Sequence, residues 1–210
     1  MKPLSSKRRV PRVSCVSGFE ELPATFTTSQ ARRAGVQFRD LYRARDEGVV
    51  LELSRGVFRR VDAPAPSYPD LLAVAYRAPR AVVCLLSAAA VHDLTDELPM
   101  AVQIAVPRRT WPPAITYPPV EVFLYDAATF ELGIAAVEAA EGEPVRVYSP
   151  ARTVVDLMRL RQRIGESVAQ IALRRYVASP GAQIGQLMEL ARALDVLGPI
   201  RSGVDLLTAS

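Results

Sequence analysis

The side chains best suited to chemistry in this chain are suited to recognising nucleic acid rather than to catalysis. The sequence predicts a helix over 37–47, with Val36, Leu41 and Ala44 forming an inward stripe. The opposite side of this helix is then expected to expose Gln37, Phe38, Arg39, Tyr42 and Arg43. Such a set suits the major groove of DNA, where arginine and glutamine pair with base edges.

Three further arginines follow on a predicted β-hairpin. Residues 49–61 alternate in polarity and turn around Ser54-Arg55-Gly56, as the two strands of a hairpin do. The sequence places Arg55, Arg59 and Arg60 on or just after this turn. We expect these arginines to contact mainly phosphates, which position a protein on DNA without reading its sequence.

The residues before the predicted helix complete a helix-turn-helix. Thr27 and Gln30 have the spacing of a capping box that starts a first helix, and Gly35 ends it. Ala31 and Ala34 are small enough to let the second helix pack closely. With the hairpin, this pattern predicts a winged helix-turn-helix over residues 18–62. The alternative is a helical pair that only packs and does not bind DNA.

The distribution of charge favours DNA binding. Residues 1–62 hold 13 Lys and Arg against 7 Asp and Glu, whereas residues 63–210 hold 13 against 15. The net charges of +6 and −2 make up the +4 of the whole chain. The basic excess therefore lies in the predicted DNA-binding part, where release of counterions gives affinity. Residues 1–17 are expected to form a basic, disordered arm along phosphates or in a minor groove, or a solvated tail without a role.

A proline-rich segment, DAPAPSYPD, predicts a linker over 63–69 and a second domain over 70–210. We expect this domain to begin with a short helix, an apolar stretch and a helix capped by Ser87. Strands are predicted in MAVQIAVP, VEVFLYD, FELGIAAVEA and PVRVYS, and helices from Pro150 onward. The fold class is α+β: a winged helix-turn-helix followed by a larger mixed α/β domain with a small sheet and C-terminal helices.

One polar pair stands out in the second domain. If a helix begins at Pro150, Arg152 and Asp156 lie four residues apart on one face and can pair. Two interpretations remain open. The pair anchors the helix to the sheet, or it faces a partner such as a protein toxin or a ligand.

Other sites are mostly excluded by composition. There is no Gly-rich phosphate loop and no lysine after Lys7, so no cofactor is expected. One His and two Cys do not make a structural zinc site, so no metal is expected either. Cys84 lies in an apolar run and fits a core position better than a nucleophile served by His92. No stretch is long enough to span a membrane or resembles a signal peptide, so we expect a cytoplasmic protein that does not bind membranes.

Three segments carry a resemblance to a known family. They are AGV…LYRARDEGVVLELSRGVF, LLSAAAVHDL and YSPARTVVDL. Together they resemble the AbiEi antitoxins, the DNA-binding halves of AbiE toxin–antitoxin operons, over nearly all of residues 20–165. Two positions depart from the family pattern: Phe58 replaces a usual Tyr, and Asp93 replaces a Gly, which concerns the local turn.

The resemblance implies an antitoxin with two tasks. It would repress its own operon by binding inverted repeats in operator DNA, which fits a weak homodimer on the DNA. It would also neutralise a co-encoded nucleotidyltransferase toxin through the larger domain. Two alternatives stay open. One is an atypical, serine kinase-like phosphotransferase that uses ATP with Mg to modify the toxin. The other is a plain repressor whose second domain dimerises or senses a ligand.

Overall fold

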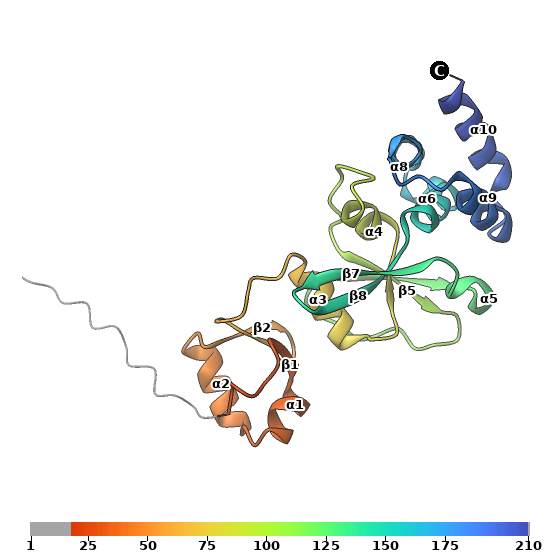
Figure 1. The fold of residues 1–210 in the computed structure, drawn as a ribbon. Helices are drawn as coiled ribbons and strands as arrows, with labels where there is room; N and C mark the ends of the chain where they lie inside the picture. Colours follow the sequence, from red (N-terminus) through yellow and green to blue (C-terminus); the bar gives the residue numbers. More distant parts are fainter. Residues whose placement is uncertain (1–17, 210) are drawn as a thin grey trace, which may run out of the picture.

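The structure, a computed structural model, describes residues 18–209, so the predicted basic arm over 1–17 lies outside the described residues. A small winged domain lies at one end and the C-terminal helices lie at the other (Figure 1). Between them lies a sheet with helices on both faces. The α+β class and the order of its two parts agree with the prediction.

The winged domain forms where local sequence signals are strongest. Its elements are β1 (Thr25–Thr27), α1 (Thr28–Arg33), α2 (Phe38–Asp46), β2 (Val50–Ser54) and β3 (Val57–Arg60). The Thr27 hydroxyl accepts from the Gln30 amide, and the Gln30 side chain accepts from the Thr27 amide, so the predicted capping box is present. Gly35 and Gly56 adopt φ values of +84° and +77°, which ends α1 and makes the tight β2–β3 turn.

Packing inside the winged domain agrees with the predicted stripe. Ala31, Val36, Leu41 and Ala44 are all buried, whereas Ala34 is exposed at the end of α1 and does not join the packing. The sheet has the order β1-β3-β2 with antiparallel pairs, and β1 was not expected from the sequence. Phe58 is fully buried and stacks on Phe26 with ring centroids 6.0 Å apart, so a phenylalanine serves here as a core aromatic.

The larger domain is built on a mixed five-stranded sheet of order β6-β5-β4-β8-β7. The pairs β4–β8 and β5–β6 are parallel, whereas β4–β5 and β7–β8 are antiparallel. Its first elements are α3 (Pro69–Arg77), β4 (Val82–Val83), α4 (Leu85–Val91), β5 (Val102–Pro107), β6 (Val120–Tyr125), α5 (Ala127–Phe130), β7 (Ile134–Ala140) and β8 (Glu143–Tyr148). All four predicted strands are present, and β4 is added in the middle.

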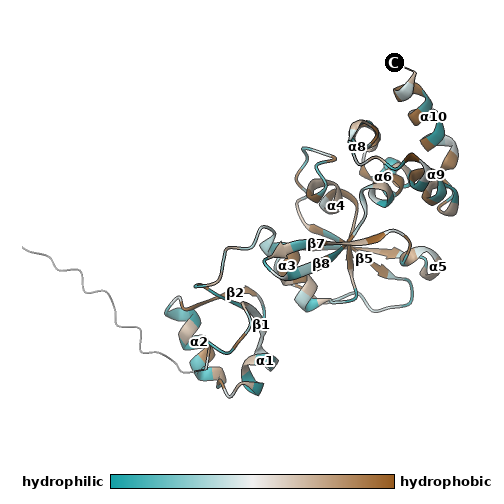
Figure 2. Ribbon diagram, viewed as in Figure 1, coloured by the Kyte–Doolittle hydropathy of each residue, from teal (hydrophilic) through white to brown (hydrophobic). Residues whose placement is uncertain are grey.

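Five helices follow within the described residues: α6 (Pro150–Arg159), α7 (Arg161–Ile164), α8 (Glu166–Ala178), α9 (Ile184–Ala193) and α10 (Leu197–Thr208). Alternate strand residues explain why both faces of the sheet are covered. Val82 and Ala105 face the core shared with α6 and α8, whereas Val83 and Ile104 face the core shared with α3. Figure 2 shows the apolar colour along β5, in the interior of the sheet. No helix in residues 18–209 combines the length and the apolar character needed to cross a membrane.

The two ends of α4 differ from what the sequence led us to expect. Ser87 does not cap this helix, because Cys84 occupies the N-cap position and the Ser87 hydroxyl accepts from the Gln103 amide of β5. Asp93 adopts φ +56° after the helix, and the Leu94 amide donates to the Ala89 carbonyl. This left-handed turn is one that Gly favours and Asp tolerates, so the turn forms despite the missing glycine.

Candidate nucleic-acid interface

The N-terminal half of α2 presents the predicted recognition residues. Gln37, Phe38, Arg39 and Arg43 are exposed on this helix, opposite the buried Leu41 and Ala44. The Arg39 side chain is 84% exposed and its nearest acidic oxygen, on Asp40, is 3.9 Å away. Such weakly held guanidinium groups remain available to DNA bases and phosphates.

Tyr42 occupies a different environment from the other four. It is half-buried, meets the Phe58 ring edge to face at 6.0 Å between centroids, and lies under the Arg45 guanidinium at 4.8 Å. Its ring therefore belongs partly to the domain core.

Arg32 was not singled out from the sequence, yet its guanidinium lies 5.5 Å from the Phe38 ring centroid. The charged end of α1, with Arg32 and Arg33, was the signal that could have indicated it.

The three hairpin arginines occupy three different environments. Arg55 is exposed on the β2–β3 turn. Arg60 is half-buried: its Nε and Nη2 donate to the Asp62 carboxylate at 2.9 and 2.6 Å, and its Nη1 donates to the carbonyls of Glu20 and Leu22. This pairing lowers the pKa of the Asp62 carboxyl. Arg60 therefore ties the strand end to the preceding segment, and Arg55 is the hairpin arginine left free for phosphate.

The prediction that Arg59 contacts phosphate is wrong. Its residue is 2% exposed, and its Nη1 donates to Glu143 Oε2 at 2.5 Å and to the Thr25 hydroxyl at 2.6 Å. Its Nη2 donates to the Pro64 carbonyl at 2.6 Å. The reason is the pleat of β3: Phe58 points into the winged core, so Arg59 points to the opposite face, which the second domain covers.

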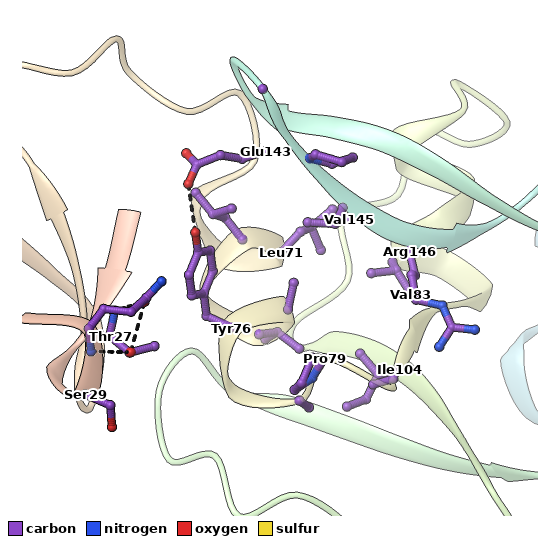
Figure 3. Close-up of a pocket in the computed structure, with 18 of the residues that line it drawn as sticks. Thr27, Ser29, Leu71, Tyr76, Pro79, Val83, Ile104, Glu143, Val145 and Arg146 are labelled. Atoms are coloured by element: carbon purple, nitrogen blue, oxygen red, sulfur yellow. Dashed lines mark hydrogen bonds between the residues drawn. The ribbon is translucent and has the colours of Figure 1, made fainter. Parts of the chain in front are cut away.

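This ion pair is part of a polar junction between the two domains. The Tyr76 hydroxyl lies 3.0 Å from both Glu143 Oε1 and the Thr25 carbonyl oxygen (Figure 3). Burial, followed by the nearby Glu143 charge, raises the pKa of Tyr76 to about 12, so its hydroxyl remains a donor at neutral pH. The segment predicted as a linker is also held, because the Tyr68 amide donates to the Ala139 carbonyl. The domains are thus docked by specific contacts.

A cleft of about 610 Å³ lies beside this junction. One wall comes from α1, with Ser29 and Gln30, and the others come from α3 and β8 (Figure 3). Its lining is largely apolar and includes Leu71, Val83, Ile104 and Val145. Among residues 18–209 there is no group of three or more His, Cys, Asp or Glu side chains that could hold a metal ion.

The Arg152–Asp156 pair forms as predicted but is completely enclosed. Arg152 Nε donates to Asp156 Oδ2 at 2.9 Å, and its Nη1 donates to the carbonyls of Thr129 and Leu132 at 2.7 and 2.6 Å. Both residues are 0% exposed, and the guanidinium lies 4.4 Å from the Tyr148 ring centroid. Neither side chain can touch a toxin in this conformation, so the toxin-facing interpretation is wrong and the bracing one holds. The pair ties α6 to the α5 turn and the sheet.

Cys84 and His92 do not form a catalytic pair. Cys84 is fully buried, which raises the pKa of its thiol, as expected of a core residue. His92 Nε2 donates to the Tyr148 carbonyl at 2.7 Å, and burial lowers the pKa of its imidazole. The histidine therefore secures the end of β8.

Comparisons with known proteins agree with the division of the chain into a winged domain and a larger domain. Residues 21–61 match the family model described as "Transcriptional regulator, AbiEi antitoxin". Residues 81–178 match the model for the AbiEi antitoxin C-terminal domain. No curated protein matches the chain.

A solved structure shares the fold. The crystal structure of the RV2827C protein from Mycobacterium tuberculosis is similar with a TM-score of 0.55 and 15% sequence identity. The match covers 89% of this chain and 77% of that one. At this identity the likeness concerns the fold alone. The two family models match residues in both domains, 21–61 in the winged domain and 81–178 in the larger one. The chain therefore belongs to the AbiEi family of antitoxins, which are transcriptional regulators of toxin–antitoxin systems.

Proposed function

We propose that this antitoxin binds inverted repeats in the operator of its own operon through α2 and the Arg55 turn, and represses transcription there. We further propose that it neutralises a co-encoded nucleotidyltransferase toxin through the domain that follows residue 69. The first proposal rests on the two sides of α2. One side exposes Phe38, Arg39 and Arg43, and the opposite side buries Leu41 and Ala44 in the winged domain. A helix with this division can enter a major groove without losing its packing.

Operator affinity of an Arg39→Ala, Arg43→Ala variant tests the DNA part. Each arginine that contacts a base contributes about 1–3 kcal/mol, so the double variant should bind the upstream region at least tenfold more weakly. Both side chains are exposed, so the fold and the melting temperature should not change. An Arg174→Ala, Arg201→Ala variant removes the same charge from exposed positions on α8 and α10 and serves as the control. Equal operator affinity of the two variants would refute the assignment of α2.

The toxin part is tested with the full chain, because α3 packs against β2 of the winged domain and a fragment would expose that surface. Co-expression with the cognate toxin should restore growth equally well for the wild type and for the Arg39→Ala, Arg43→Ala variant. This outcome would show that neutralisation does not need operator binding. Loss of protection by this folded variant would mean that the two tasks share one surface.

A further inference from the structure

The cleft beside the domain junction is built from both domains. Residues of β1 and α1 line it from the winged domain, and residues of α3 and of the larger sheet supply the rest. Its volume of about 610 Å³ is within the range of about 300–1,000 Å³ that small-molecule sites occupy. In Figure 3, Ser29 lies at one end, and Val83 and Ile104 lie at the other. A molecule held in the cleft would therefore contact both domains.

The side of the cleft formed by the larger domain is mostly apolar. The side chains that make up this surface come from α3 and from three strands of the sheet, and they are Leu71, Val74, Ala75, Val83, Ile104 and Val145. Such a surface favours a hydrocarbon chain, because apolar atoms gain free energy when they leave water. It offers little to the sugar or base of a nucleotide, which need polar partners when they are buried.

The side formed by α1 is polar, and its donors are unused. The Ser29 hydroxyl, Gln30 Nε2 and the Arg33 guanidinium have no hydrogen-bond partner among residues 18–209. Gln30 Oε1 already accepts from the Thr27 amide in the capping box, which leaves the Nε2 group to donate. Ser29 and Arg33 are four residues apart, so they lie on one face of the helix with Gln30 beside them. Three donors and no free acceptor suit a negatively charged head group.

Among the described residues that line the cleft, one charge is uncompensated. Glu143 Oε2 accepts from Arg59 Nη1 at 2.5 Å, and Arg146 pairs with Glu131 at 3.0 Å. Arg33 is exposed and has no acidic partner in the described part of the chain. A single free guanidinium matches a ligand with one negative charge. A nucleoside triphosphate would bring several negative charges to a surface that offers one free cation.

We propose that this cleft binds a carboxylic acid with an elongated apolar chain. The carboxylate pairs with the Arg33 guanidinium and accepts from Ser29 and Gln30, and the chain lies along α3 toward Val83 and Ile104. Because the two domains supply the two halves of the site, the ligand binds only when they are docked, and its binding stabilises the docked fold. The site is separate from the proposed operator and toxin contacts and does not depend on either.

Calorimetric titration of the full chain with octanoate, octan-1-ol and octylamine tests the class of ligand. The three probes share one chain length and differ in the head group, so a difference in affinity reports recognition of the head. Octanoate should bind at one site per chain and at least tenfold more tightly than octan-1-ol, and octylamine should bind least. Equal affinity for octanoate and octan-1-ol, or no binding of octanoate, would refute the proposal.

Three variants locate the bound molecule. Arg33→Gln should weaken octanoate binding at least tenfold and leave octan-1-ol binding unchanged, because it removes only the charged contact. Arg174→Gln, the control, removes an exposed charge from α8 and should bind both probes like the wild type. Ala75→Phe places a ring in the apolar part of the cleft and should weaken both probes. Equal octanoate affinity of the Arg33 and Arg174 variants would overturn the proposal, and so would wild-type affinity of the Ala75 variant.

Methyl NMR spectra provide a reading that does not rely on substitutions. Octanoate should shift the methyl signals of Val83, Ile104 and Val145 and leave those of Leu187 and Ile200 unchanged, which are buried among the C-terminal helices. Shifts confined to the C-terminal helices would place the molecule elsewhere and refute the site. These measurements contain neither DNA nor toxin. Their failure would leave the proposed function standing, and loss of operator binding or of toxin neutralisation would not affect them.

Discussion

The ion pair between Arg59 and Glu143 should be required for stability rather than for DNA binding. The Arg59 side chain is 3% exposed and that of Glu143 is 14% exposed. Removing one partner of such a pair leaves a buried charge uncompensated, at a cost of about 3–5 kcal/mol. Glu143→Ala leaves the Arg59 guanidinium with the Thr25 hydroxyl and the Pro64 carbonyl only. Because Glu143 is partly reached by water, we expect the lower end, about 3 kcal/mol.

For a chain of this length, about 3 kcal/mol corresponds to a fall in melting temperature of about 6–12 °C. Thermal unfolding of Arg59→Ala, Glu143→Ala and the double variant measures this directly. The two single losses should not add in the double variant, because either one already breaks the same contact. Independent, additive losses would refute the buried pair.

Arg55 on the same hairpin is the matched comparison, because its side chain is exposed. Arg55→Ala should change stability by less than about 0.5 kcal/mol and make the salt dependence of operator binding shallower by about 0.9. Arg59→Ala should show the reverse, with reduced stability and an unchanged salt slope. A normal melting temperature for Arg59→Ala together with a shallower slope would contradict the structural assignment.

Three further predictions concern the larger domain. Asp156→Ala should lower the free energy of unfolding by about 3–5 kcal/mol, because it leaves Arg152 charged and enclosed, so thermal stability and toxin neutralisation should fall together. A growth assay that shows lost neutralisation at a normal melting temperature would restore a functional role for the pair. Gly133→Ala should destabilise the fold more than Gly142→Ala does in denaturant titrations. Both glycines have φ near +70°, but a Cβ at Gly133 would lie 2.7 Å from Arg152 Cβ, whereas nothing lies within 4 Å of a Cβ at Gly142. The single imidazole, His92, should titrate below 6.5 in NMR spectra. Since its folded pKa is lowered, its contribution to stability is complete above about pH 6.5 and is lost as the pH falls through the folded pKa, and His92→Gln should remove that dependence.

Much of the winged domain could be predicted because its signals are local. The capping box of Thr27 and Gln30 and the glycines at 35 and 56 each fix a conformation through neighbours within a few residues. The helices of the second half were similarly marked, because α6 begins at Pro150, where the predicted helical part begins, and α7 to α10 follow it. Strand β1, with three residues, was missed, and the two-residue β4 was expected only as an apolar stretch. Such short segments carry no periodicity of their own and depend on distant partners.

The errors in the candidate site share a cause, which is contact between segments far apart in sequence. Alternation along β3 indicates that Arg59 and Phe58 point to opposite faces, but it does not show that another domain covers one of them. Ser87 has the type of a helix cap, yet its partner is an amide on β5. For Arg152, the apolar residues that follow it on α6 were a usable sign of burial, since a helix buried all round must enclose its polar groups too.

Docking of the two domains has a consequence for how copies would be arranged around DNA. With a flexible linker the larger domain could take many orientations, but the contacts at Arg59, Tyr76 and Arg77 fix its orientation relative to the winged domain. If the winged domain binds DNA as proposed, these contacts also set the direction in which the larger domain points from the duplex. On an inverted repeat, the angle between the two large domains is then set by the number of base pairs between half-sites. Adding about five base pairs would turn one copy to the opposite side of the helix, and adding about ten would return it. Operator spacing would thereby decide whether the two large domains of neighbouring copies meet or face apart.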